Sequence, residues 1–191
     1  RTIGGEWRGR KLHFPSLAGL RPTPDRVRET VFNWLQFDLA GARCLDLFAG
    51  SGALGLEALS RGAAEVVLVE REPAAARAIE AALTRLHCDR GRVERLDASE
   101  YLARTPGRPF DVVFLDPPYA GNLLPASVRQ LQAGGWLAPQ ALLYLEDAAA
   151  KGVPELPSGW QVLRSKRAGD VGYHLARRSM LAEQEGEARG E

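Results

Sequence analysis

Hydrophobic residues along this chain fall into two alternating patterns. Short apolar runs predict buried strands at residues 43–48, 65–70, 92–96, 111–115 and 141–146. Apolar residues at helical spacing predict helices at residues 24–37, 52–61, 73–87, 99–103 and 127–133. Because strands and helices alternate, we expect a parallel sheet that is covered by helices on both faces.

The chain departs from this rhythm near its end. Residues 160–166 and 173–178 flank a turn at Ala168-Gly169-Asp170, and together they predict a β-hairpin. A hairpin at this point puts one antiparallel strand into the parallel sheet. The predicted fold is therefore α/β, with a mostly parallel seven-stranded sheet, a C-terminal antiparallel hairpin and a short N-terminal extension.

Charge divides the chain into three parts. The net charge is only +1, but residues 1–30 carry seven basic and three acidic side chains, and residues 180–191 carry one basic and four acidic ones. We expect a basic extension at residues 1–40 (a short hairpin and a helix), a main domain at 41–178 and a disordered acidic tail at 179–191. The basic extension suits an anionic partner such as a nucleic acid, although a solvated arm is an equally good interpretation.

Composition narrows the class of protein further. Apolar residues make up 45% of the chain, yet no run approaches the ~20 apolar residues that span a bilayer. Cys44 and Cys88 form neither a metal-ligand pattern nor a disulfide framework. We therefore expect no metal site and a cytoplasmic location.

A glycine-rich loop joins the first predicted strand to its helix. Gly50, Gly52 and Gly55 satisfy the G-x-G-x-x-G pattern, and Glu70 ends the next predicted strand. This combination is typical of dinucleotide binding, with the acid on a ribose hydroxyl. An NAD-dependent oxidoreductase is therefore one of the functions that the sequence allows.

Further carboxylates favour a different cofactor. Asp46 ends the strand before the glycine loop, where it would repel a pyrophosphate but could hold the ammonium group of a methionine, directly or through water. Asp97 and Asp116 also follow predicted strands, so they should share one cleft with Asp46 and Glu70 at the carboxyl edge of the sheet. An acidic cleft suits a cationic sulfonium better than the phosphates of NAD.

The strand at residues 111–115 ends in the sequence Asp116-Pro117-Pro118-Tyr119. The two prolines make a rigid loop without N–H donors, which by itself could be a stiff turn. The Asp116 carboxylate and the Pro117 carbonyl could accept both hydrogens of an exocyclic base amine and stabilise the charge that develops on its nitrogen. Tyr119 offers a face on which a flipped-out base can stack.

The order of these motifs resembles the RsmD-type methyltransferases, which methylate the exocyclic N2 amine of a guanine in small-subunit (16S) ribosomal RNA. The N-terminal blocks are the more specific part, because Asp-Pro-Pro-aromatic also fits adenine-N6 methyltransferases. The residues that carry the resemblance are 1–5, 8–11, 20–23, 25–30, 32–35, 45–46, 48–58 and 116–119. The resemblance implies a Rossmann-like class I fold and S-adenosyl-L-methionine as the methyl donor.

The resemblance also implies roles for individual residues. Glu70 would hold the ribose hydroxyls, and Asp97 with the Ala98 amide would hold the adenine edge. The full set expected around the donor is Asp46, Phe48, Ala49, Gly50, Ser51, Gly52, Glu70, Arg71, Asp97, Ala98 and Asp116. The target base would be held by Asp116, Pro117, Pro118 and Tyr119.

The expected partner is 16S ribosomal RNA within the small ribosomal subunit, bound by a monomer of this chain. The basic residues expected to contact the RNA backbone are Arg8, Arg10, Lys11 and Arg21. Trp7 lies among them and is either a part of that contact or a packing anchor. A DNA or RNA adenine-N6 methyltransferase and an NAD-dependent oxidoreductase remain the alternatives at this point.

Overall fold

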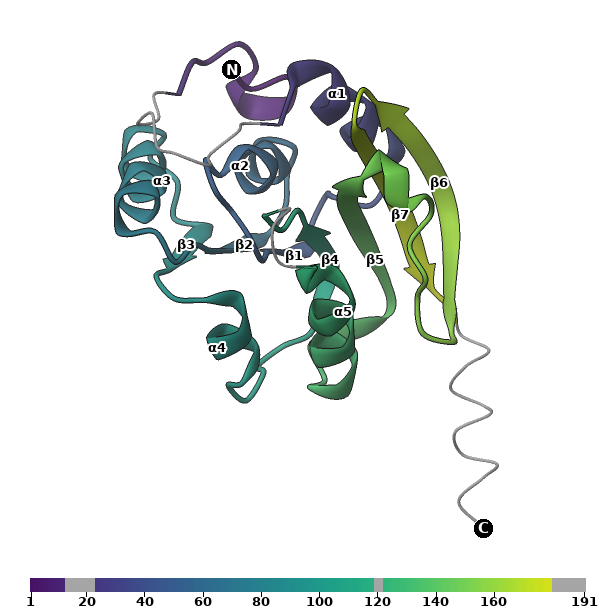
Figure 1. Cartoon of the computed structure of the whole chain (residues 1–191). Helices are drawn as coiled ribbons and strands as arrows, with labels where there is room; N and C mark the ends of the chain where they lie inside the picture. The colour runs from purple at the N-terminus through teal and green to yellow at the C-terminus, as the bar shows by residue number, and fades with distance from the viewer. Residues whose placement is uncertain (13–22, 119–121, 180–191) are drawn as a thin grey trace.

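A seven-stranded sheet forms the centre of the protein (Figure 1). The computed structural model describes residues 1–12, 23–118 and 122–179. The strands are β1 Arg43–Asp46, β2 Glu65–Val69, β3 Gly91–Glu94, β4 Phe110–Leu115, β5 Leu137–Ala148, β6 Trp160–Ala168 and β7 Val171–Arg178. Their order in the sheet is β3-β2-β1-β4-β5-β7-β6, with β1 to β5 parallel and β7 antiparallel to both of its neighbours. The predicted α/β fold, with its C-terminal hairpin, is confirmed.

Helices cover both faces of the sheet (Figure 1). One face carries α1 Asp25–Trp34, α2 Ala53–Ser60 and α3 Pro73–Arg85, and the other carries α4 Ala98–Leu102 and α5 Leu123–Ala133. Two short 3-10 helices, η1 Gly5–Trp7 and η3 Ala149–Lys151, complete the described elements. Each face of the sheet therefore has its own hydrophobic core.

The strand β2 shows why this sequence folds into such a sheet. Its side chains alternate between the two cores, with Val66 and Leu68 in one and Val67 and Val69 in the other. All four are at most 1% exposed. A continuous apolar run is therefore stabilised only where both faces of the strand are covered.

Several predicted elements differ from the observed ones in length, and the helix at residues 24–37 and the strand at residues 141–146 show why. The helix expected at residues 24–37 ends at Trp34, and tighter turns follow in which Asp38 N donates to Leu35 O over 2.9 Å. The strand expected at residues 141–146 extends over Leu137–Ala148. It is longer because β4 pairs along one side of it and β7 along the other, which recruits residues that carry no apolar pattern of their own.

The N-terminal segment packs on the outside of α2. Thr2 N donates to Arg10 O over 3.1 Å and Gly9 N donates to Thr2 O over 2.8 Å, so residue 2 lies beside residues 9 and 10. Between them the chain forms η1 rather than strands. Among the described helices, none has the length and hydropathy of a membrane span.

The order of the strands determines where a ligand can bind. In the sheet, β2 lies next to β1 on one side, and β4 lies next to β1 on the other side. The order of the strands therefore reverses its direction at β1. Loops diverge at such a switch point and open a crevice at the carboxyl ends of the strands. The glycine loop after β1 and the Asp116 loop after β4 both lie at this position.

Candidate active site

The loop between β1 and α2 has a backbone conformation that favours glycine. Gly50 has a φ of 57° and Gly52 a φ of 79°, both in the left-handed region. Gly52 N donates to Ala49 O over 2.8 Å, and Ala49 N donates to Val69 O over 2.9 Å. The loop is therefore a tight turn that is fastened to the end of β2.

Asp46 ends β1 and points into this turn. Its side chain is only 1% exposed, and its Oδ2 accepts a 3.0 Å hydrogen bond from Gly55 N in the first turn of α2. Its Oδ1 is buried and has no hydrogen-bond partner within the described residues. Burial raises the pKa of Asp46 to about 7, against the effect of the Gly55 bond and with a further contribution from the charge of Glu70.

Glu70 follows β2 and holds the glycine loop from the opposite side. Its Oε2 accepts a 2.7 Å hydrogen bond from Gly50 N, and its Oε1 accepts a 3.0 Å bond from Glu72 N. Each carboxylate oxygen can accept a second hydrogen bond, so the side chain, which is only partly buried, can still receive the hydroxyls of a ribose.

The other residues expected around the donor lie at the same edge of the sheet. Asp97 caps α4, and its Oδ1 accepts a 3.4 Å bond from Ser99 N, while Ala98 is buried in the first turn of that helix. Phe48 is half-buried against the second core, and Arg71 is exposed just after β2. The order of the strands thus brings these residues to one edge, as the sequence predicted.

Asp116 follows β4 at the switch point. Its side chain is partly buried, Pro117 is buried and Pro118 is exposed, while Tyr119 lies outside the described residues. Burial is the main reason that the pKa of Asp116 is raised well above its usual range, and the charges of Glu146 and Asp46 add to it. The Asp116 carboxyl is thus placed among other acids in a weakly hydrated site.

Glu146 is the site residue that the sequence did not suggest. It lies near the end of β5, is 5% exposed, and accepts a 3.1 Å hydrogen bond from the hydroxyl of the fully buried Tyr144. Its carboxyl group is hydrogen-bonded to that of Asp116, and burial raises its pKa. The available signal was an acid at the end of an apolar run, next to the strand that ends in Asp116.

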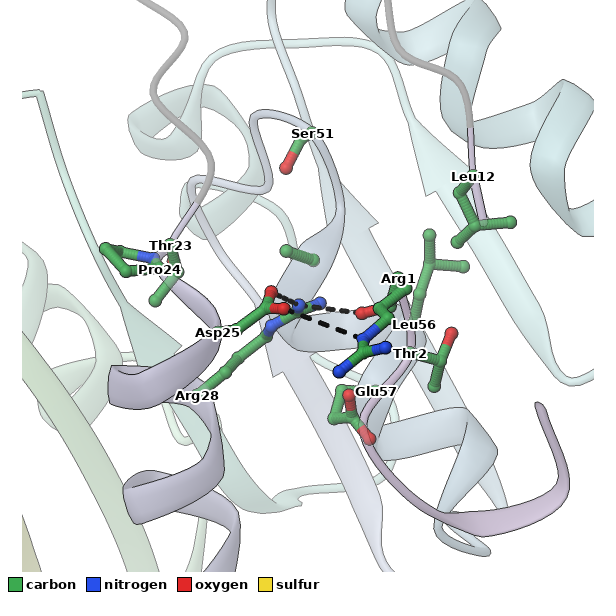
Figure 2. Close-up of a pocket in the computed structure, with 11 residues that line it drawn as sticks. Arg1, Thr2, Leu12, Thr23, Pro24, Asp25, Arg28, Ser51, Leu56 and Glu57 are labelled. Atoms are coloured by element: carbon green, nitrogen blue, oxygen red, sulfur yellow. Dashed lines mark hydrogen bonds and ion pairs between the residues drawn. The ribbon is translucent and has the colours of Figure 1, made fainter. Parts of the chain in front are cut away.

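A cavity of about 290 Å³ lies beside the glycine loop, between the N-terminal segment, α1 and α2 (Figure 2). Among the described residues expected around the donor, only Ser51 lines it. The wall opposite is held together by Arg28, whose Nη2 donates to Arg1 O over 2.7 Å and pairs with Asp25 Oδ1 at 2.5 Å. The N-terminal segment therefore borders the site, but the cavity is separate from the cluster of carboxylates.

The basic residues expected to bind RNA lie in the same N-terminal segment. Arg8, Arg10 and Lys11 are all exposed, and none of them forms an ion pair within the parts of the chain that the structure describes. Arg21 lies outside the described residues. Trp7 is only 3% exposed and its backbone N–H donates to Ser60 Oγ over 2.9 Å, so it is a packing anchor and cannot stack on a base.

The residues around the glycine loop fit a methyl donor with a cationic amino acid moiety. The buried Asp46 Oδ1 lacks a donor, and a ligand ammonium or a bound water would supply one. At Gly55, a Cβ would lie 2.6 Å from Leu68 Cδ2 and 3.2 Å from Asp46 Oδ2, so the absence of a side chain keeps the Asp46 carboxylate against the loop. Within the described ranges, no group of three or more His, Cys, Asp or Glu side chains is arranged to hold a metal ion.

A glycine loop and strand-end carboxylates on a sheet of this order define a Rossmann-like methyltransferase of the class that uses S-adenosylmethionine. The chain belongs to the family described as Conserved hypothetical protein 95, whose model matches residues 1–177. Family membership favours the methyl donor over the dinucleotide, so the oxidoreductase interpretation of the glycine pattern is not retained.

Curated relatives and solved structures agree with this assignment. The ribosomal RNA small subunit methyltransferase D of Escherichia coli strain K12 is 48% identical over 96% of this chain and 92% of its own length. The enzyme of the same name from Haemophilus influenzae is 43% identical over 92% of each chain. A solved candidate methyltransferase from Escherichia coli, yhhF, superposes with a TM-score of 0.88 at 45% identity and covers 94% of this chain and 98% of its own.

Proposed function

We propose that this protein transfers the methyl group of S-adenosylmethionine to the exocyclic N2 amine of a specific guanine in 16S ribosomal RNA, within the small ribosomal subunit. The observation that carries the reaction is the Asp116 loop, which follows β4 at the switch point, beside the carboxylates of the glycine loop. The substrate class rests on the relatives named as ribosomal RNA small subunit methyltransferases. The cytoplasmic location and the monomeric state expected from the sequence stay predictions.

The donor would be held by the glycine loop and its two flanking acids. Asp46 would receive the ammonium group, directly or through water, and Glu70 would accept hydrogen bonds from the ribose hydroxyls. Asp97 and the Ala98 N–H would bind the edge of the adenine, since both lie at the start of α4. When bound, the sulfonium of the donor supplies an electrophilic methyl group.

The target base would be held by the Asp116 loop. An exocyclic amine is a poor nucleophile, because its lone pair is delocalised into the ring. Acceptance of its two hydrogens by Asp116 and by the Pro117 carbonyl orients the amine and stabilises positive charge on the nitrogen. Because Pro117 and Pro118 lack an N–H, neither residue offers a backbone donor that competes for these acceptors. A base within a duplex cannot reach this site, so the target must be unpaired or flipped out.

Unpaired cations on two surfaces support an RNA substrate. Besides Arg8, Arg10 and Lys11, the exposed residues Arg164 and Lys166 on β6 form no ion pair within the described part of the chain. The β6–β7 turn lies at the carboxyl end of β5, because Ala148 pairs with Val171. Cations on both sides of the carboxyl edge can contact the phosphates of one RNA.

An adenine-N6 methyltransferase is the second candidate, because the Asp116 loop serves either base. The two are distinguished by mass spectrometry of the nucleosides of small subunits, prepared from a strain that lacks its own enzyme and then treated with this protein. We expect one added N2-methylguanosine per 16S RNA and no N6-methyladenosine. Naked 16S RNA is the matched substrate, and it should be methylated more slowly than the assembled subunit. N6-methyladenosine as the product would contradict the proposal.

A further inference from the structure

The contact between Asp116 and Glu146 follows from the register of two parallel strands. Leu115, the last residue of β4, pairs with Leu145 of β5, so Asp116 just after β4 lies beside Glu146, which is still within β5. Tyr144 stands two positions before Glu146 and shares its face of β5, and this places the tyrosine hydroxyl 3.1 Å from Glu146 Oε2. The pair is thus built into the sheet.

The surroundings of this pair are acidic or neutral. Asp46 approaches from β1, Tyr144 belongs to β5 itself, and Tyr173 of β7 pairs with Glu146 across the sheet. Within the described residues, no lysine, arginine or histidine forms an ion pair with either carboxyl group. Two carboxyl groups form a hydrogen bond only when one of them carries a proton, and no cation is present to replace that proton.

The hydroxyl of Tyr144 determines which partner keeps its charge. It donates to Glu146, and a hydrogen bond to the ionised form of a carboxylate favours that form. The shared proton therefore lies on Asp116, between the two groups, and the second oxygen of Asp116 can accept a hydrogen bond. Glu146 is the ionised member of the pair.

We propose that Glu146 is a positioning residue and proton acceptor for Asp116, and that the two carboxyl groups act as a relay for the proton that the methylated amine loses. This inference rests on the proposed function. As the bond between nitrogen and the methyl carbon forms, the bond between that carbon and sulfur breaks, and its electron pair stays on sulfur. The nitrogen then gives a proton to the free oxygen of Asp116, and Asp116 passes its own proton to Glu146. Charge balances, because Glu146 is neutralised as the amine loses its positive charge.

Two substitutions should shift the pH profile of kcat in opposite directions. In Glu146→Gln, Asp116 loses a negative neighbour and becomes the acceptor itself, so we expect the acidic limb of the profile to move to lower pH. In Tyr144→Phe, Glu146 loses a hydrogen-bond donor and binds its proton more tightly, so the acidic limb should move to higher pH. We expect kcat to fall about 100-fold in the first variant, a loss typical of general acid–base groups, and only a few-fold in the second.

The measurement is single-turnover methyl transfer to small subunits between pH 5.5 and pH 8.5, together with calorimetry of S-adenosylhomocysteine binding and thermal unfolding of each variant. Glu146→Asp is the matched control, because it keeps a carboxylate at this position. We expect it to retain part of the kcat that Glu146→Gln loses, with the acidic limb closer to its wild-type pH. Affinities for cofactor and RNA should change less than threefold. A lower kcat with an unmoved acidic limb would show a structural role and overturn the inference. No transfer by the wild-type protein would instead contradict the proposed function.

Discussion

Two pairs of carboxylates stand at the same edge of this sheet, and they are held in opposite ways. Asp46 and Glu70 accept hydrogen bonds from the backbone N–H groups of Gly55 and Gly50. Asp116 and Glu146 lie against each other, and within the described residues the hydroxyl of Tyr144 donates a hydrogen bond to Glu146. The first pair is organised by the backbone of a loop, whereas the second is organised by the register of two strands.

The difference separates two chemical tasks. Backbone donors favour the ionised form of a carboxylate, which receives an ammonium group or sugar hydroxyls, and at Asp46 the Gly55 N–H opposes the burial that raises its pKa to about 7. A second carboxyl group favours retention of a proton, which is the condition needed to receive and pass on another one. Asp46 belongs to the first pair but also acts electrostatically on Asp116, so the two pairs are linked through it.

The largest effect should come from removal of the Asp116 carboxyl. In Asp116→Ala we expect methyl transfer to fall roughly 10³-fold, because an acceptor aimed at the developing charge is lost. Binding of S-adenosylhomocysteine, measured by calorimetry, should change less than threefold, since the glycine loop is intact. Equal loss of binding and of transfer would place Asp116 in the cofactor site alone and remove the distinction between the two pairs.

RNA binding should depend on the N-terminal cations and not on either pair of carboxylates. Replacement of Arg8, Arg10 and Lys11 by glutamine should weaken RNA binding roughly 50-fold and lower the salt slope of the affinity by about 2, because three phosphate contacts are lost. Cofactor binding should stay unchanged. The matched control replaces three other exposed arginines, which are Arg85 on α3, Arg108 in the chain before β4 and Arg129 on α5. An equal effect in both triple variants would assign only a general charge effect to the N-terminal segment.

The Asp46 carboxyl should make cofactor binding depend on pH. Because its pKa is raised to about 7, the ionised form becomes predominant as pH rises, and only this form attracts an ammonium group. Between pH 6 and pH 7.5 the affinity for S-adenosylhomocysteine should rise roughly eightfold. In Asp46→Asn, which can keep the hydrogen bond from Gly55 N, this dependence should be absent. A variant that keeps the wild-type dependence would move the titrating group elsewhere.

The smallest effect concerns the loop that organises the first pair. In Gly55→Ala, the added Cβ meets Leu68 and Asp46, and we expect a loss of stability of about 1–3 kcal/mol, typical of overpacking. Gly107→Ala is the control, because nothing lies within 4 Å of the added atom. Chemical denaturation of the two variants measures the difference. Equal free energies of unfolding for Gly55→Ala and Gly107→Ala would mean that the glycine loop adjusts to the added atom and is not rigid.

Much of this organisation could be predicted from local sequence. Apolar runs and glycines mark the strands and the loop after β1, and strand order then brings Asp46, Glu70 and Asp116 to one edge. These predictions succeed because a buried strand and a left-handed turn depend on neighbours in the sequence. The Asp-Pro-Pro loop is visible for the same reason.

Glu146 could not be identified in this way, because its role depends on the register between β4 and β5, which are 30 residues apart at Leu115 and Leu145. The burial of Trp7 likewise depends on a distant partner, Ser60 in α2. An aromatic among cations has the same local appearance whether it packs inward or stacks on a base. The placement of Glu146 and the burial of Trp7 both depend on tertiary contacts, which local sequence does not specify.

The proposed reaction is methylation of guanine N2 in 16S ribosomal RNA at the Asp116 loop. The most direct measurement treats unmethylated small subunits with a labelled methyl donor and either the wild-type protein or Asp116→Ala, and then analyses the nucleosides by mass spectrometry. We predict label in one N2-methylguanosine per subunit with the wild type and none with the variant, although both bind S-adenosylhomocysteine. Label in another nucleoside, or an equal yield from the variant, would contradict the account.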